Sequence, residues 1–408
     1  MWLKHTTPTE RITLTASFGG YAVDAFDYMI YTMLIPTLMA AWSMSKAEAG
    51  LIATVTLWAS ALGGWAAGVL ADRYGRVRVL QWTVVWFSVF TFLCGFSQTP
   101  GQLMAARALQ GFGFGGEWSV GSVLIAETIR SHYRGRAVGL VQSSWAIGWG
   151  AAALAFAWVY TALSPELAWR VLFWMGVLPA LLIIYIRRNL TEPEVYLHAK
   201  RQEQESNEKT SFLAIFSPDI LKTTLLASLL IMGMQGGYYT ITTWLPTFLK
   251  TERQLSVLGT GGYLLVIISG SFAGYLTSAW LSDHLGRKKC FMLFALMSLL
   301  IVTTYMQIPI TDAQMMLLGF PLGFFVSGIF SGAGAFLSEL FPHQLRGSGQ
   351  GFCYNFGRGT GSFFPALVGI LSATMPLSKT IGMLAAAAYG LVIVTLLFLP
   401  ETRGKALH

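Results

Sequence analysis

Charged side chains stand inside three long apolar segments of this 408-residue chain. Asp24 and Asp27 are three residues apart, so a helix places both carboxyl groups on one face. Arg107 and Glu117 lie in a second apolar segment, and Arg358 lies in a third. A charged residue at the centre of a bilayer costs about 2.5 to 3.5 kcal/mol on insertion scales. Each of these residues therefore requires a polar partner or a functional role.

Other polar side chains share helical faces with these charges. Gln110 and Trp118 follow the stripe of Arg107 and Glu117, and a further segment carries polar and aromatic residues at helical spacing. Amide, phenol and hydroxyl groups of this kind can bind a small polar molecule. The candidate substrate-binding residues are Arg358, Gln235, Tyr238, Tyr239, Thr242, Asn355 and Tyr31.

The spacing of the charges suggests two kinds of chemistry. All six histidines lie in predicted loops or at the ends, so a proton crossing the membrane would be carried by a carboxyl group. The first candidates are Asp27 and Glu117, followed by Asp24, with Arg107 as their partner. The alternative is a fixed ion pair between Arg107 and Glu117. Arg358 can offer two parallel donors to a substrate carboxylate, or it can serve a structural contact instead.

The composition indicates which elements hold these residues. The chain is 54% hydrophobic and only 11% charged, which is too few charges to cover the surface of soluble domains. The net charge of +8 does not indicate nucleic-acid binding, because the basic residues stand in breaks between apolar runs. The scattered Cys94, Cys290 and Cys353 predict neither disulfides nor a metal site, and we expect no cofactor.

The apolar runs and polar breaks predict twelve membrane-spanning helices. The first six lie near residues 17–41, 48–71, 79–97, 101–127, 137–160 and 168–187. The second six lie near residues 220–249, 259–282, 290–308, 313–340, 349–373 and 379–399.

The basic residues predict the orientation of these spans. Twenty Lys and Arg residues fall on the side of the termini and four on the opposite side. By the positive-inside rule, both termini are cytoplasmic in the inner or plasma membrane. The one long polar stretch, near residues 189–218, is predicted to be a cytoplasmic linker.

The chain contains an internal repeat. The break LADRYGRVR, residues 70–78, returns as LSDHLGRKK, residues 281–289, at an offset of 211. A Glu that precedes Arg-Gly by seven residues also returns, at an offset of 212. We therefore predict an all-α membrane protein of two pseudo-symmetric six-helix halves, residues 1–188 and 219–408, joined by the linker 189–218.

The repeated breaks combine carboxylates, basic residues and glycines at the predicted cytoplasmic surface. A carboxylate there can meet a helix N-terminus or a guanidinium, and contacts between the halves would stabilise one conformation. We predict a conformational latch formed by these residues: Asp72, Arg73, Gly75, Arg76, Asp283, Gly286, Arg287, Glu127, Arg134, Glu339 and Arg346. The alternative is a set of plain polar turns.

These motifs resemble the major facilitator superfamily over the whole chain. GVLADRYGRVRVL, residues 68–80, is similar to the superfamily signature after span 2, and Arg107 with Gln110 and Gly111 is similar to its span 4 signature. DAFD, residues 24–27, and GGEW, residues 115–118, resemble the sialate and monocarboxylate proton symporters and the relatives that import aromatic acids. This chain has Ala25 where the aromatic-acid branch favours Gly. PETRG, residues 400–404, resembles the end motif of sugar porters.

The resemblance implies proton-coupled import of a small organic carboxylate by alternating access. Its partners would be protons, an organic anion and the lipid bilayer, with one chain acting as a monomer. A sugar or polyol porter and a proton-driven efflux antiporter are the alternatives. No P-loop, H-E-x-x-H or G-x-S-x-G motif is present, so we expect neither an ATP-driven pump nor an enzyme. The short loops disfavour a receptor.

Overall fold

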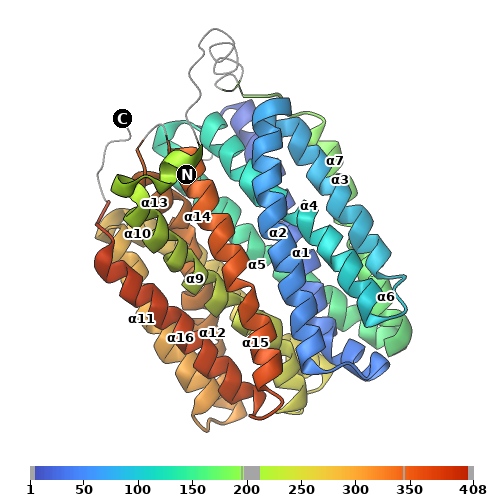
Figure 1. The fold of residues 1–408 in the computed structure, drawn as a ribbon. Helices are drawn as coiled ribbons and strands as arrows, with labels where there is room; N and C mark the ends of the chain where they lie inside the picture. The colour runs from blue at the N-terminus through green and yellow to red at the C-terminus, as the bar shows by residue number, and fades with distance from the viewer. Residues whose placement is uncertain (1–4, 194–195, 197–211, 343–344, 403–408) are drawn as a thin grey trace.

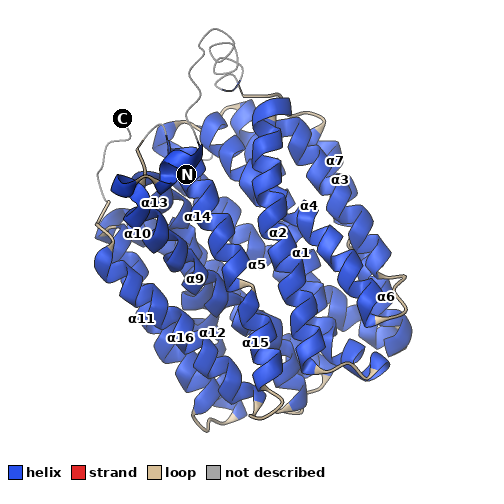
Figure 2. Ribbon diagram, viewed as in Figure 1, coloured by secondary structure: helices blue, strands red, loops and turns tan. Residues whose placement is uncertain are grey.

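The computed structural model describes residues 5–193, 196, 212–342 and 345–402. The described part is a bundle of helices without strands (Figure 2). The first helix begins and the last helix ends at the same end of this bundle (Figure 1). We call this end the termini face and the other end the opposite face.

Twelve crossings are present, as the sequence predicted. The first six crossings are α1 (Pro8–Trp42), α2 (Lys46–Tyr74), α3 (Arg76–Cys94), α4 (Pro100–Thr128), α5 (Ser131–Ala162), and α6 (Pro165–Met175) together with α7 (Leu178–Arg187). A short 3-10 turn, η2 (Phe212–Phe216), precedes the second six. These are α9 (Pro218–Thr251), α10 (Val257–Leu285), α11 (Arg287–Gln307), α12 (Asp312–Gly328) with η3 (Ile329–Gly332) and α13 (Ala333–Leu340), α14 (Arg346–Gly361) with α15 (Phe363–Leu371), and α16 (Leu377–Phe398).

The first helix begins nine residues earlier than the predicted span. Thr7 and Glu10 form a capping box, in which each side chain accepts a hydrogen bond from the backbone amide of the other residue. Polar capping residues carry no hydropathy signal, so the apolar run alone could not locate this start. Glu10 also binds the Arg130 guanidinium at 2.9 Å, and this hydrogen bond lowers the pKa of Glu10 to about 2.

Single glycines connect α2 to α3 and α10 to α11. Gly75 and Gly286 have φ of 106° and 98°, which only glycine adopts without strain. A Cβ at either glycine would also contact a carboxylate, that of Glu192 or that of Glu401. The same turn therefore recurs in both parts of the chain.

The helices pack in the same pairs before and after the linker region. The pairs α2–α4, α3–α4 and α1–α5 recur as α10–α12, α11–α12 and α9–α14. The two sets meet where α2 packs on α14 and α15, α5 packs on α10, and α1 packs on α9. This arrangement confirms the predicted fold of two pseudo-symmetric six-helix halves. The boundaries of the linker stay a prediction, because most of it lies outside the described residues.

Nine helices of the described part are long and apolar enough to cross a membrane. The three crossings outside this set are α1, α4 and α14 with α15. These are the crossings that carry the charged residues singled out in the sequence, which lower their mean hydropathy. The charged residues singled out in the sequence thus lie in three crossings of an otherwise apolar bundle.

Candidate functional site

The first cluster of the site joins α1 to α4. Asp27 is 1% exposed and Arg107 is fully buried, and 3.6 Å separates Arg107 Nη1 from Asp27 Oδ2. Gln110, one turn along α4, donates a hydrogen bond from its amide to the same carboxylate. The Arg107 guanidinium also lies 4.8 Å from the ring centroid of Tyr31. Asp27 is therefore held by an ion pair and an amide.

The second cluster joins α4 to α7. Glu117 forms a buried ion pair with Arg187, whose Nη1 also donates to the carbonyl oxygen of Leu80 at 2.9 Å. The alternative of an Arg107–Glu117 pair is wrong, because ten residues along one helix separate the two side chains by about 15 Å. A Cβ at Gly20 on α1 would collide with both members of the Glu117–Arg187 pair, so this glycine admits them.

Sequence reasoning missed Arg187. It ends a predicted span and precedes Arg188, so we counted it among the cytoplasmic basic residues. The structure buries it completely. A signal existed in the charge balance, since the first half has three carboxylates at span depth and only Arg107 to oppose them.

We expect Arg187→Gln to destabilise the protein by about 3 to 5 kcal/mol, because Glu117 would stay buried without its counter-charge. The double variant Glu117→Gln/Arg187→Gln should recover much of this loss. Thermal unfolding in detergent measures both. A single variant as stable as the wild type would show that the pair does not stabilise the fold.

Asp24 lies between the two clusters and differs from both. It is 1% exposed, and neither carboxylate oxygen has a hydrogen-bond partner in the described part of the chain. The charged groups that interact electrostatically with the Asp24 carboxyl group are Glu117, Arg187, Asp27 and Arg358. The buried interior of the first half therefore holds two carboxylate–guanidinium pairs and one further carboxyl group.

Arg358 is the buried charge of the second half. It is 2% exposed, and its Nη1 donates to Ser60 Oγ on α2 at 2.9 Å. Its guanidinium carbon lies 5.5 Å from the ring centroid of Phe114 and 5.2 Å from that of Tyr354. No carboxylate of the described residues forms an ion pair with it. Arg358 is thus a buried cation between the halves with aromatic rings beside it.

Aromatic rings from both halves extend this environment. Tyr28 contacts Phe114 and Tyr239, with ring centroids 6.3 and 5.3 Å apart. Trp145 donates from Nε1 to the hydroxyl of Tyr238 at 2.6 Å, which joins α5 to α9. We call the following set the aromatic cage: Tyr21, Tyr28, Phe114, Trp118, Trp145, Tyr238, Tyr239, Phe330 and Tyr354.

Two of the other predicted binding residues retain free polar atoms, although each is buried. Gln235 Nε2 and Asn355 Oδ1 have no hydrogen-bond partner among the described residues. Asn355 Nδ2 donates to the carbonyl oxygen of Gly351 at 3.0 Å. Both amides therefore keep an unsatisfied polar atom in the interior, and their role in binding stays a prediction.

Thr242 and Tyr31 are placed differently. Thr242 donates to the carbonyl oxygen of Tyr238 in its own helix at 2.9 Å. Tyr31 donates to the carbonyl oxygen of Ala49 at 2.8 Å and lies with Arg107, not with Arg358. Their side chains are thus engaged in contacts within the protein.

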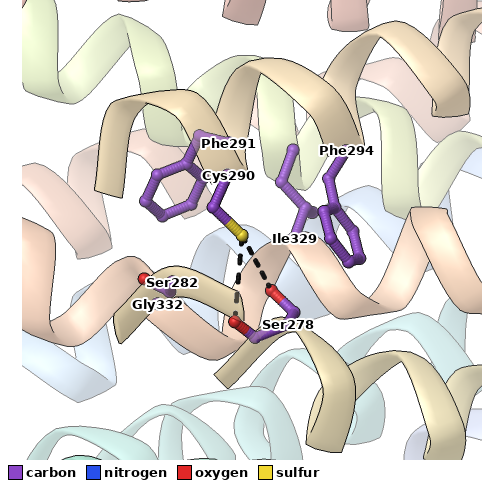
Figure 3. A pocket seen from close by; sticks show the side chains of 7 residues that line it. All are labelled: Ser278, Ser282, Cys290, Phe291, Phe294, Ile329 and Gly332. Atoms are coloured by element: carbon purple, nitrogen blue, oxygen red, sulfur yellow. Dashed lines mark hydrogen bonds between the residues drawn. The ribbon is translucent and has the colours of Figure 1, made fainter. Parts of the chain in front are cut away.

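Side chains fill the region around Arg358 and the aromatic cage in this conformation. Tyr28 and Arg358 are at most 2% exposed, whereas Tyr21 and Trp118 reach 8% and 7%. A pocket elsewhere, between α10, α11 and η3, is lined by two serines, Cys290 and apolar residues, and Cys290 Sγ lies 3.7 Å from Ser278 Oγ (Figure 3). That pocket has no charged residue and is separate from the aromatic cage.

The predicted latch residues form two equivalent clusters. Arg76 binds Asp72 at 2.5 Å and Glu127 at 3.2 Å, and its backbone amide donates to Glu192. Arg287 likewise binds Asp283 at 2.6 Å and Glu339 at 3.4 Å, and its amide donates to Glu401. Apart from Glu192, which lies in the predicted linker, each partner lies in the same half as its arginine, so these groups do not make the expected contacts between halves.

Arg73 and Arg346 of the predicted latch make other contacts. Arg73 stacks on the ring of Tyr74 at 5.4 Å, and Arg346 Nε donates to the carbonyl oxygen of Ser338 at 3.0 Å. The side chain of Arg134 lies outside the described residues. The two clusters therefore connect helices within each half. A role in latching one conformation stays a prediction.

We expect Asp72→Asn to change the balance of conformations more than substrate affinity. The Asp72 side chain is 74% exposed, and an exposed pair of this kind contributes about 0 to 1 kcal/mol. Spin-label distances across the termini face, between cysteines at Arg136 and Lys289, would report the balance. An effect on affinity alone would contradict the prediction.

The family model of the Major Facilitator Superfamily matches residues 17–279 and 269–407. The chain belongs to the major facilitator superfamily. It is 39% identical over 407 residues to the "Probable 4-methylmuconolactone transporter" of Cupriavidus pinatubonensis, covering 100% of this chain and 94% of that one. It is 26% identical to the "Cis,cis-muconate transport protein" of Acinetobacter baylyi, covering 96% and 95%.

Solved structures agree on the fold. The proton:xylose symporter XylE bound to 6-bromo-6-deoxy-D-glucose superposes with a TM-score of 0.78 at 17% identity, covering 98% of both chains. The family match and the named relatives show that the protein is a multi-pass membrane transporter and not an enzyme, as the sequence predicted.

Proposed function

We propose that the protein is a proton-coupled symporter that imports a small, flat organic carboxylate by alternating access. The observation that carries this proposal is Arg358, a buried guanidinium between the halves without a carboxylate partner in the described part. A buried cation needs a counter-charge, and a guanidinium can bind a carboxylate through two parallel donors. The aromatic cage offers ring faces to a planar, unsaturated acid. The names of the relatives, which cite a muconolactone and a muconate, favour the same chemistry.

The other part of the proposal concerns the proton. Asp27 and Glu117 each have a buried guanidinium partner, whereas Asp24 has none. Asp24 is therefore the first candidate for the proton carrier, ahead of Asp27 and Glu117. An ionised Asp24 can balance the charge of Arg358, and a substrate carboxylate on Arg358 would repel it. Binding of the anion is then favoured when Asp24 holds a proton. Transport of the anion is thereby coupled to transport of the proton.

This scheme predicts the driving force. With one proton for each negative charge of the substrate, one for a monovalent anion and two for muconate, no net charge moves, so only the pH gradient contributes, at about 1.4 kcal/mol per unit for each proton. We propose that the termini face lies on the cytoplasmic side of the inner or plasma membrane, which the excess of Lys and Arg near the termini supports. Because one chain contains both halves, we propose that a monomer transports.

The test is uptake into vesicles that contain the purified protein. Labelled cis,cis-muconate should accumulate when the exterior is acidic, and collapse of the pH gradient should stop accumulation. Protein-free vesicles control for leakage. Gradient-insensitive uptake, or flux of no organic acid, would contradict the proposal.

A sugar porter is the second candidate, because PETRG and the XylE fold both allow it. In this structure Glu401 of that motif accepts hydrogen bonds from the backbone amides of Arg287 and Thr402 on the termini face. It has a structural contact there and does not reach the aromatic cage. A sugar also has no carboxylate for Arg358 to bind. Uptake of labelled xylose in the same vesicles separates the two candidates.

A further inference from the structure

The helix that carries Arg358 is interrupted one turn after it. The sequence predicted one span over 349–373, yet the structure ends α14 at Gly361 and begins α15 at Phe363. Pro365 lacks an amide hydrogen, so it cannot donate the bond that would continue the helix. In a continuous helix the amide of Ala366 would donate to the carbonyl oxygen of Ser362.

A hydroxyl of the other half bridges this interruption. Thr54 Oγ1, on α2, donates to the carbonyl oxygen of Ser362 at 2.6 Å and accepts from the amide of Ala366 at 3.2 Å. Thr54 is 3% exposed, and Ser362 is fully buried. One side chain of the first half thus satisfies a donor and an acceptor in the second half.

The surrounding contacts hold the two helices close together. A Cβ at Gly50 would lie 2.5 Å from the carbonyl oxygen of Pro365, and one at Gly369 would meet the backbone of Lys46. Gly50 and Lys46 stand at the end of α2 that lies at the opposite face. Both are about 13 Å or less from Thr54 along the helix. The bridge therefore exists only while α2 and α15 are in contact.

We propose that Thr54 is a positioning residue of the transport cycle, whose hydroxyl holds the opposite face closed by completing the interrupted helix of Arg358. When this face opens, the Ser362 carbonyl and the Ala366 amide lose their partner and need water instead. Arg358 contacts Ser60, which lies on α2 six residues after Thr54. The crossing formed by α14 and α15 therefore carries the substrate anchor. Together with α2 it also makes the contact that closes the opposite face.

The internal repeat offers no equivalent bridge in the second half. The position 211 residues after Thr54 is Leu265, which has no hydroxyl and is exposed. Gly150, the counterpart of Ser362 on α5, has only an apolar neighbour at the site of a Cβ, from Ile268. The bridge is thus a feature of one of the two interfaces between the halves.

The experiment measures closure directly. Spin labels on cysteines at Ala41 and Ala373, both exposed on the opposite face, report its opening in a background where Cys94, Cys290 and Cys353 are replaced. Thr54→Val keeps the side-chain shape and removes the hydroxyl, which leaves two buried backbone groups unpaired. We expect the open-to-closed population ratio to rise about tenfold or more.

Two variants make the test specific. Thr54→Ser retains the hydroxyl and should keep the wild-type distance distribution. Gly50→Ala should open the same face by steric conflict, which confirms that the labels detect opening. Distances in Thr54→Val that match the wild type, or equal opening in Thr54→Ser, would overturn the inference.

Transport gives a second measurement, which rests on the proposed function. Uptake by Thr54→Val should show a maximal rate lowered about tenfold with KM changed less than about twofold, because closure and not binding is impaired. An unchanged maximal rate would contradict a role in the cycle. If the protein carries no organic acid, the proposed function fails, while the spin-label distances still decide the role of Thr54.

Discussion

Arg358→Ala is expected to lower the affinity for the transported acid about 100-fold or more. Two charge-assisted hydrogen bonds to a carboxylate contribute about 1.5 to 3 kcal/mol each, and the variant removes both. Binding to purified protein, measured by calorimetry with cis,cis-muconate, checks this prediction without requiring transport.

Arg358→Lys is the matched control for this prediction. Lysine keeps the charge but loses the planar pair of donors, so we expect an intermediate affinity. The variants also lose the bond to Ser60 Oγ, and Ser60→Ala tests that contact alone. Unchanged affinity in Arg358→Ala would exclude Arg358 as the anchor.

Asp24→Asn is expected to abolish accumulation against a gradient while exchange of labelled for unlabelled acid continues. The amide has nearly the shape of the carboxyl group and cannot release a proton, so the carrier stays in its substrate-binding form. Because neither Asp24 oxygen has a partner in the described structure, the replacement breaks no ion pair. Accumulation and exchange are measured in the same vesicles.

Asp27→Asn is the informative comparison. It removes the partner of buried Arg107, so we expect a loss of stability of about 3 to 5 kcal/mol in addition to any loss of transport. Undiminished accumulation by Asp24→Asn would exclude Asp24 as the carrier. A loss of uphill uptake in a stable Asp27→Asn protein, with Asp24→Asn active, would assign the proton to Asp27.

The sequence predicted the crossings because hydropathy and the repeat are properties of whole segments. It also identified the charges at span depth other than Arg187, since an ion there needs a reason to be present. It did not predict their partners: Asp27 binds Arg107, and Glu117 binds Arg187 from the end of α7. Pairing depends on the rotation and depth of separate helices, which a list of apolar runs does not contain.

The contact of Thr54 with Ser362 shows this limit most clearly. A threonine in an apolar helix resembles many others, and its partner lies 308 residues away along the chain. The latch motifs were recognised for the opposite reason, since Asp-x-x-Gly-Arg recurs in sequence. Two further partners, Glu192 and Glu401, were not predicted because they lie after the last helix of each half.

The polar character of α1 has a consequence for biosynthesis. This helix leaves the ribosome before the other described helices, and its two buried aspartates disfavour stable residence in lipid as an isolated segment. Asp27 obtains its guanidinium only when α4 is made, 80 residues later. The nascent first helix would therefore wait near the insertion machinery until its partner emerges, and the first half would enter the bilayer as one cooperative assembly.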